Sequence, residues 1–263
     1  MLNFLFTQTP LAFLTQSFWR DEAFTYFLAK KNVFEIINLS INDFNPPLYY
    51  LLLHFWMRLF GPSEISLRSF SFIFFWATLY VCFLFLQEVQ KLNLKKSLLY
   101  LSLFLFNPFL LYYAFEARNY TLLAFFATLS YYSFYKKKYK LYFFATLFGL
   151  YTHYFMLFVV LSQMLFNYLK NKMGKKYHMI KSIILKPLFI FLPWFLFVLI
   201  QKKFFATSFW IQKINFKTAV DLLGVLYTGY DGGITSYSAG ITLISITILL
   251  LIIYLLKMRN KKY

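Results

Sequence analysis

The chain is poor in charged residues, which make up 14% of its 263 residues. A soluble globular domain has about 25% charged and about 45–50% apolar residues, whereas 60% of this chain is apolar and 24% is aromatic. This composition excludes an ordinary soluble domain. It also excludes an intrinsically disordered chain, because disorder requires low hydrophobicity. Long apolar runs separated by short lysine clusters favour an all-α polytopic membrane protein.

Cysteine and acidic residues are also scarce. The single cysteine, Cys82, lies inside an apolar run, which excludes an intrachain disulfide and favours a buried packing role. Nine acidic residues stand against 27 lysines and arginines, so the formal net charge is +18. No basic stripe lies on a polar, foldable module, and we therefore expect no nucleic-acid partner.

Apolar runs of membrane-spanning length recur along the chain. A bilayer core of about 30 Å requires about 20 apolar helical residues. Residues 141–169 are too long for one span and are interrupted at Thr152 and His153, so we expect two short helices there. This gives about seven predicted spans: residues 65–87, 97–115, 120–135, two within 141–169, 183–200 and 239–256.

Two further apolar stretches do not fit a span. Residues 47–60 are too short to cross and follow Asn45, a possible helix cap, with proline in the first turn and Gly61 at the end. We predict a helix lying at the membrane interface. Residues 1–18 are interrupted by Pro10 and neighbouring polar residues, and we expect a stunted first membrane segment.

The lysine clusters orient these spans. If the loop after residue 87 is cytoplasmic, then alternation places every short lysine cluster on that side, as the positive-inside rule requires. The predicted organisation is an extracytoplasmic loop with juxtamembrane helices (19–64), a transmembrane core (65–200), a second outer loop (201–238) and a last helix with a basic tail (239–263). We expect a multi-pass protein of the plasma membrane.

The acidic residues gather on the opposite side. Eight of the nine fall outside in this topology, and only Glu88 falls inside. The positive-inside rule does not require this distribution, because acidic residues contribute little to orientation. The outer face is therefore where candidate chemistry is expected.

Four acidic residues of the first outer loop allow different interpretations. Asp21 and Glu22 begin a helical pattern, where carboxylates either stabilise the helix start or act in chemistry. Glu35 follows Asn32 at the spacing of a capping box, which favours a structural role. Asp43 lies in a proline-containing loop, and turn formation and function are equally compatible with its position.

Other candidates come from later outer segments. Glu116 and Arg118 share a short loop between two spans, where they either pair with each other or bind a ligand. His153 lies at the outer end of its helix, and Lys202 and Lys203 begin the second outer loop. Five side chains share the outer face and could in part coordinate a divalent metal, although no spacing specifies one: Asp21, Glu22, Asp43, Glu116 and His153.

Six short motifs, in this order, resemble the GT-C superfamily of polyprenyl-phosphate-sugar-dependent glycosyltransferases, near its protein O-mannosyltransferase-like and RgtA/B/C/D-like branch. The resemblance covers about residues 18–235. The motifs are residues 19–23 (Trp-Arg-Asp-Glu-Ala), 43–50 (Asp-Phe-Asn-Pro-Pro-Leu-Tyr-Tyr), 59–64 (Leu-Phe-Gly-Pro-Ser-Glu), 67–69 (Leu-Arg-Ser), 116–120 (Glu-Ala-Arg-Asn-Tyr) and 152–155 (Thr-His-Tyr-Phe).

The resemblance implies a large first outer loop with juxtamembrane helices and catalysis at the extracytoplasmic face. It implies that Asp21 is the catalytic carboxylate and that Asp43 is the second acidic position of that loop. Family members normally begin with a full span and continue through further spans or a soluble domain. The resemblance therefore also implies a chain that is short at both ends.

The functional hypothesis is transfer of a sugar from a polyprenyl-phosphate donor to a glycan, lipid or protein acceptor. Asp21 is the expected base in an inverting displacement, with Asp43 or Glu22 orienting the acceptor or the base. The expected contacts to the donor phosphate or substrate come from residues of the later outer segments: Glu116, Arg118, Tyr120, His153, Lys202 and Lys203. The alternatives are a lipid or sugar transporter or flippase, and a non-catalytic membrane partner of a larger complex.

Overall fold

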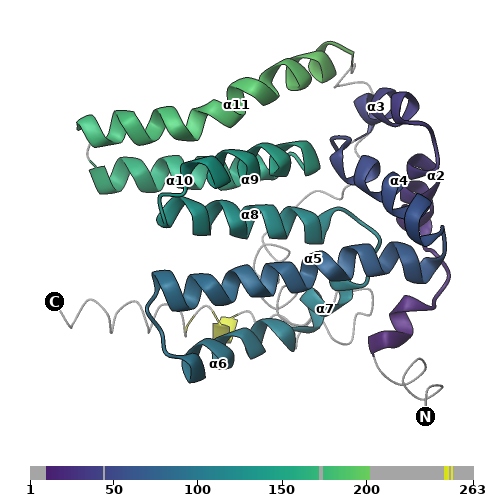
Figure 1. The fold of residues 1–263 in the computed structure, drawn as a ribbon, viewed down its shortest axis with the longest axis horizontal. Coiled ribbons are helices and arrows are strands. Elements are labelled where there is room, and N and C mark those ends of the chain that lie inside the picture. The colour runs from purple at the N-terminus through teal and green to yellow at the C-terminus, as the bar shows by residue number, and fades with distance from the viewer. Residues whose placement is uncertain (1–9, 44, 172–173, 202–245, 249, 251–263) are drawn as a thin grey trace. The chain divides into compact units, whose positions relative to one another are not determined.

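The computed structural model describes residues 10–43, 45–171, 174–201, 246–248 and 250, which form helices and no strand (Figure 1). The predicted span 239–256 lies almost wholly outside the described residues, as do Lys202 and Lys203. The helices in chain order are η1 (Pro10–Leu14), α2 (Arg20–Ala29), α3 (Val33–Asn42), α4 (Leu48–Phe60), α5 (Glu64–Leu84), η2 (Phe85–Val89), α6 (Leu94–Leu105), α7 (Pro108–Ala114), α8 (Tyr120–Tyr135), α9 (Tyr139–Thr152), α10 (Met156–Asn171) and α11 (Lys175–Gln201).

The chain divides into two compact units, and the first comprises residues 1–102 and 113–206. Within this unit α5 packs against α8, α8 against α9, and α9 and α10 against α11. Figure 1 shows α5, α8, α9 and α11 side by side, with α2, α3 and α4 gathered at one end of them. Short connections between successive helices force this antiparallel order.

The prediction of one continuous helix over residues 97–115 is wrong. It is divided into α6 and α7, and the break lies at Asn107 and Pro108. Proline disfavours helical backbone in the residue before it and is well tolerated in the first turn of the next helix. Asn107 uses both of its oxygens to start α7: its side chain accepts from the N–H of Leu110, and its carbonyl accepts from the N–H of Leu111.

Two helical segments are long and apolar enough to cross a membrane. They are Glu64–Val89, which contains the predicted span 65–87, and Tyr177–Gln201, which contains the predicted span 183–200. The helices α8, α9 and α10 have 14 to 16 residues, fewer than the length usual for a span. The run 141–169 is divided into α9 and α10 at His153, as its interruption predicts.

Helix α4 confirms the predicted short helix after Pro47, but the predicted cap is wrong. The residue before the helix is Pro47, and no side chain caps it. Asn45 does not serve as the cap because it is buried and its side-chain oxygen accepts a hydrogen bond from Asn119. Gly61 ends the helix as predicted, with a φ of 83° that favours glycine.

Most of the described acidic residues lie at a different end of the helices in this unit from the lysine clusters. Arg68, near the start of α5, contacts Glu22, and Glu88, past the end of α5, contacts Lys136 at the end of α8. The lysine-rich connections that follow η2, α8 and α10 therefore lie at one end, which we call the lysine end. Asp21, Glu22, Asp43 and Glu116 lie at the other, which we call the acidic end. This separation agrees with the topology expected from the sequence.

We predict that these two ends lie on opposite sides of the membrane. In a Cys82→Ser background, Lys31→Cys places a thiol at the acidic end and Lys96→Cys places one at the lysine end; both parent lysines are exposed. A membrane-impermeant maleimide added to intact cells should label the first variant. It should label the second only after permeabilisation. Labelling of both from the same side would contradict the topology.

Candidate functional site

The acidic end is built around a buried ion pair between α2 and α5. The Glu22 side chain is 1% exposed and that of Arg68 is 4% exposed. Arg68 donates from Nε to Oε1 of Glu22 at 2.9 Å and from Nη2 to Oε2 at 2.6 Å. Two parallel charge-assisted hydrogen bonds satisfy both charges, which makes burial of the pair tolerable.

The same pair holds two neighbouring segments. Arg68 also donates to the backbone carbonyls of Leu14, Gln16 and Ser17, so it fixes the segment that leads into α2. Glu22 Oε1 accepts the backbone N–H of Ala117 at 2.9 Å. The carboxylate thereby ties the loop between α7 and α8 to the start of α2.

Asp21 and Arg118 meet beside this buried frame. Arg118 Nη2 lies 3.6 Å from Asp21 Oδ2, and the Asp21 side chain is 41% exposed whereas that of Arg118 is 12% exposed. Nη1 of Arg118 also donates to the Asp21 carbonyl at 3.3 Å and to Thr25 Oγ1 at 3.4 Å. The guanidinium lies 5.7 Å from the centre of the Tyr120 ring. Of the two alternatives for Arg118, pairing with Glu116 or binding a ligand, the first is not observed: its ion pair is with Asp21.

Glu116 is the buried acid of the site. Its side chain is 4% exposed. The pKa of this carboxyl is raised to about 7, chiefly by burial and also by the charges of Glu22 and Asp21, while Arg118 and a hydrogen bond from Trp19 oppose the rise. Glu116 therefore exchanges a proton near neutral pH.

Asp43 is held by the start of α4. Its Oδ2 accepts the hydroxyl of Tyr50 at 2.6 Å and the side-chain amide of Asn45 at 3.5 Å. Burial and the neighbouring Asp43 carboxylate raise the pKa of Tyr50 well above its usual range, so the phenol stays protonated and remains a donor. Asn119 continues the network by donating to Asn45 at 2.9 Å and to the carbonyl of Thr152 at 3.1 Å.

His153 lies in the turn between α9 and α10. Its Nδ1 accepts the backbone N–H of Phe155 at 3.0 Å. Burial lowers the pKa of His153 to about 4, the positive charge of Arg118 lowers it as well, and Asp43 opposes both. The imidazole is therefore neutral at pH 7, with its proton on Nε2, and serves as a hydrogen-bond donor there.

The structure brings most of the predicted site residues to the acidic end. Glu35 takes no part in the contacts of the candidate site and forms the predicted capping box instead. Asn32 Oδ1 accepts the N–H of Glu35 at 2.9 Å, and the Glu35 side chain accepts the N–H of Asn32 at 3.2 Å. Lys202 and Lys203 lie outside the described residues. The sequence reasoning did not identify Arg68, Tyr50 or Asn119 as parts of the site. The role of Arg68 could have been predicted, since it is the one charged residue within the apolar run 65–87 and a charge there needs a partner.

The described residues do not form a metal site. Among them no three acidic, histidine or cysteine side chains are grouped so that they could hold a metal ion. Glu22 already binds Arg68 and Asp43 already binds Tyr50, so two of the carboxylates have protein partners. The chemistry available to this set of side chains is proton transfer at Asp21 and Glu116 and anion binding at Arg118.

We predict that Glu116 makes the stability of the chain depend on pH. Its folded pKa of about 7 lies above the ordinary 4.5, so the protonated carboxyl stabilises the fold below the ordinary value, and this contribution is lost as pH rises through about 7. Glu116→Gln has no proton to lose. It should therefore become more stable relative to the native chain as pH rises from about 5 to about 8, as measured by thermal unfolding in detergent.

The matched control is Glu35→Gln, because glutamine preserves a capping box and Glu35 is exposed. Its stability relative to the native chain should not change with pH in the same way. If the native chain and Glu116→Gln show parallel pH profiles, Glu116 is not the buried titrating acid.

Comparison with known proteins finds no matching family model, no matching characterised protein and no matching solved structure. The resemblance to GT-C glycosyltransferases therefore remains a prediction from the sequence motifs. Any functional assignment depends on those motifs together with the geometry of the acidic end.

Proposed function

We propose that this chain is a membrane glycosyltransferase that moves a sugar from a polyprenyl-phosphate donor to an acceptor hydroxyl or amine at the acidic end. The observation that carries the proposal is the Asp21–Arg118 pair, in which a half-exposed carboxylate lies 3.6 Å from a guanidinium. A base for the acceptor and a cation for the phosphate are the two groups that such a transfer needs.

Asp21 is the carboxylate best placed to act as the base. A general base must reach the acceptor proton, and the Asp21 side chain is 41% exposed. Glu22, its neighbour, is buried and bound by Arg68, so its role is to position the start of α2. Asp43 is bound by Tyr50 and orients the loop before α4.

Arg118 is the residue assigned to the donor phosphate. A guanidinium offers paired donors in a fixed plane, which suits the oxygens of a phosphate. Its Nε is buried and has no hydrogen-bond partner among the described residues, whereas its two Nη atoms contact Asp21 and Thr25. The Tyr120 ring lies against the face of the Arg118 guanidinium. This contact holds the guanidinium in place when the Asp21 side chain moves to the acceptor.

The reaction is a single displacement at the anomeric carbon. The acceptor oxygen or nitrogen gives its proton to the Asp21 carboxylate and forms a bond to that carbon. The bond from the carbon to the phosphate oxygen breaks, and the phosphate leaves with the electron pair as an anion beside Arg118. Attack from the face opposite the leaving group inverts the configuration.

The surroundings of the site suit a lipid-linked donor. Arg68 and Glu22 join it to the start of Glu64–Val89, one of the two segments that could cross a membrane. Trp19, Phe24 and Phe27, next to or within α2, are exposed aromatic side chains. Apolar rings beside a charged site at a span end provide a surface for the isoprenoid chain while the phosphate reaches Arg118.

We predict that Asp21→Asn abolishes most of the transfer, with a loss of about 10²- to 10⁴-fold in rate, because asparagine cannot accept the acceptor proton. The measurement is transfer of labelled sugar from a polyprenyl-phosphate donor in membranes that contain the variant. Retention of the lipid-linked donor should be close to native, since Arg118 is unchanged.

Glu35→Gln is again the matched control, since it changes an outer carboxylate that takes no part in the site; it should transfer at the native rate. Thermal unfolding of both variants should be close to native. Native transfer rates in a correctly folded Asp21→Asn variant would rule out Asp21 as the base.

A further inference from the structure

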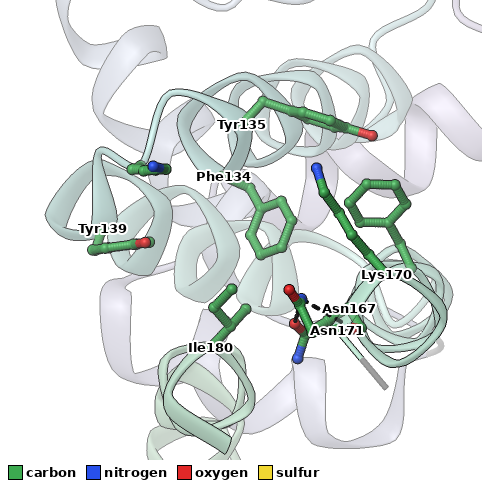
Figure 2. Close-up of a pocket in the computed structure, with 9 residues that line it drawn as sticks. Phe134, Tyr135, Tyr139, Asn167, Lys170, Asn171 and Ile180 are labelled. Carbon is green, nitrogen blue, oxygen red and sulfur yellow. Dashed lines mark hydrogen bonds between the residues drawn. The ribbon is translucent and has the colours of Figure 1, made fainter. Parts of the chain in front are cut away.

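A cavity of about 90 Å³ lies at the lysine end, far from the carboxylates of the candidate site. It opens among the end of α8, the start of α9, the end of α10 and the start of α11 (Figure 2). Phe134, Tyr135 and Phe166 form most of its aromatic wall, and Lys137 and Lys170 also line it. The cavity therefore combines an apolar wall with two cations.

The two lysines have no carboxylate to neutralise them in the described part of the chain. Both side chains are exposed, and neither forms an ion pair there. Glu88 is the one described carboxylate at this end, and it already binds Lys136 at 2.8 Å and Tyr132 at 2.9 Å. The ammonium group of Lys170 lies 5.3 Å from the centre of the Phe166 ring. Among the described residues, the lining of this cavity therefore carries positive charge without a carboxylate beside it.

Lys137 occupies a backbone position that normally belongs to glycine. Its φ is 57°, and the N–H groups of Lys137 and Lys138 donate to the carbonyls of Phe134 and Ser133, which is the hydrogen-bond pattern of a Schellman motif. Left-handed backbone is strained for a lysine. The side chain at this position thus lines the cavity at a cost in stability.

The cavity lies at the level where the two possible spans end. Ile180 lines it and belongs to the first turn of Tyr177–Gln201. Glu88, near the end of Glu64–Val89, contacts Tyr132 and Lys136, which adjoin the lining residues of α8. In a membrane this is the depth of the lipid headgroups, where tyrosines and lysines are favoured.

Two asparagines fix the walls of the cavity. Asn167 is buried and donates from Nδ2 to the carbonyl of Tyr177 at 3.1 Å. Asn171 donates to the backbone and side-chain oxygens of Asn167 at 3.1 and 2.7 Å. These bonds tie the end of α10 to the start of α11, so the position of Lys170 relative to Ile180 is set before any ligand binds.

We propose that this cavity binds an anionic phospholipid of the leaflet at the lysine end. The lipid phosphate lies between Lys137 and Lys170, whose charges it neutralises. The cavity is too small for a whole lipid, so the acyl chains run along the exposed apolar side chains of α10 beside it, Leu165 and Leu169. The inference is separate from the proposed transferase activity and requires only that the chain lies in a membrane.

The test uses the full chain in nanodiscs of phosphatidylcholine containing phosphatidylglycerol, with the lipid retained after delipidation measured by mass spectrometry. The native chain should retain phosphatidylglycerol over phosphatidylcholine. Lys170→Gln and Lys137→Gly should each lower this preference by about fivefold, since each removes one of the two charges that contact the bound lipid phosphate, and one such contact contributes about that factor. Lys96→Gln, an exposed lysine at the same end that does not line the cavity, is the control and should retain the native preference.

Lys137→Gly separates binding from folding. Glycine relieves the left-handed strain, so this variant should be at least as thermally stable as the native chain while it retains less phosphatidylglycerol. Equal retention by the native chain and the two cavity variants would overturn the proposal, as would an equal loss in Lys96→Gln. Displacement of the retained lipid by millimolar inorganic phosphate, with the same dependence on the two lysines, would assign the cavity to a free anion instead.

Discussion

The ion pair between Glu22 and Arg68 is the interaction on which the acidic end depends. Arg68 is the one charged residue of the apolar run 65–87, and burying it is tolerable only with a carboxylate and further acceptors around it. Glu22 supplies that carboxylate and also accepts the N–H of Ala117. Since Asp21 precedes Glu22 and Arg118 follows Ala117, the buried pair also brings Asp21 and Arg118 together.

The chain concentrates different chemistry at the two ends of one set of helices. At the acidic end a carboxylate, a guanidinium, a buried acid and a neutral imidazole lie near one another, which suits proton transfer and phosphate binding. At the lysine end the cations exceed the single described carboxylate, and an aromatic cavity lies among them. Both arrangements fit a protein whose helix ends meet phosphate-bearing lipids on opposite faces of a bilayer.

Much of the fold follows from local signals in the sequence. The bounds of α8 and the break at His153 could be predicted, because the apolar runs are interrupted by polar and charged residues. The role of Asn45 could not be predicted, since its partner Asn119 is 74 residues away. The neighbouring sequence alone indicates only a helix cap. The same holds for Glu22, which the sequence assigns to catalysis or orientation. Its partner Arg68 lies 46 residues further on, and pairing at that distance is fixed by packing.

A double-mutant cycle on Glu22 and Arg68 tests most directly whether the buried pair organises the acidic end. Glu22→Gln and Arg68→Met should each destabilise the full chain in detergent by about 3–5 kcal/mol, because each leaves the other charge buried without its partner. The double variant should lose much less than the two losses combined, which indicates strong coupling. Additive losses would contradict the account, because they would show that the two side chains stabilise the fold independently.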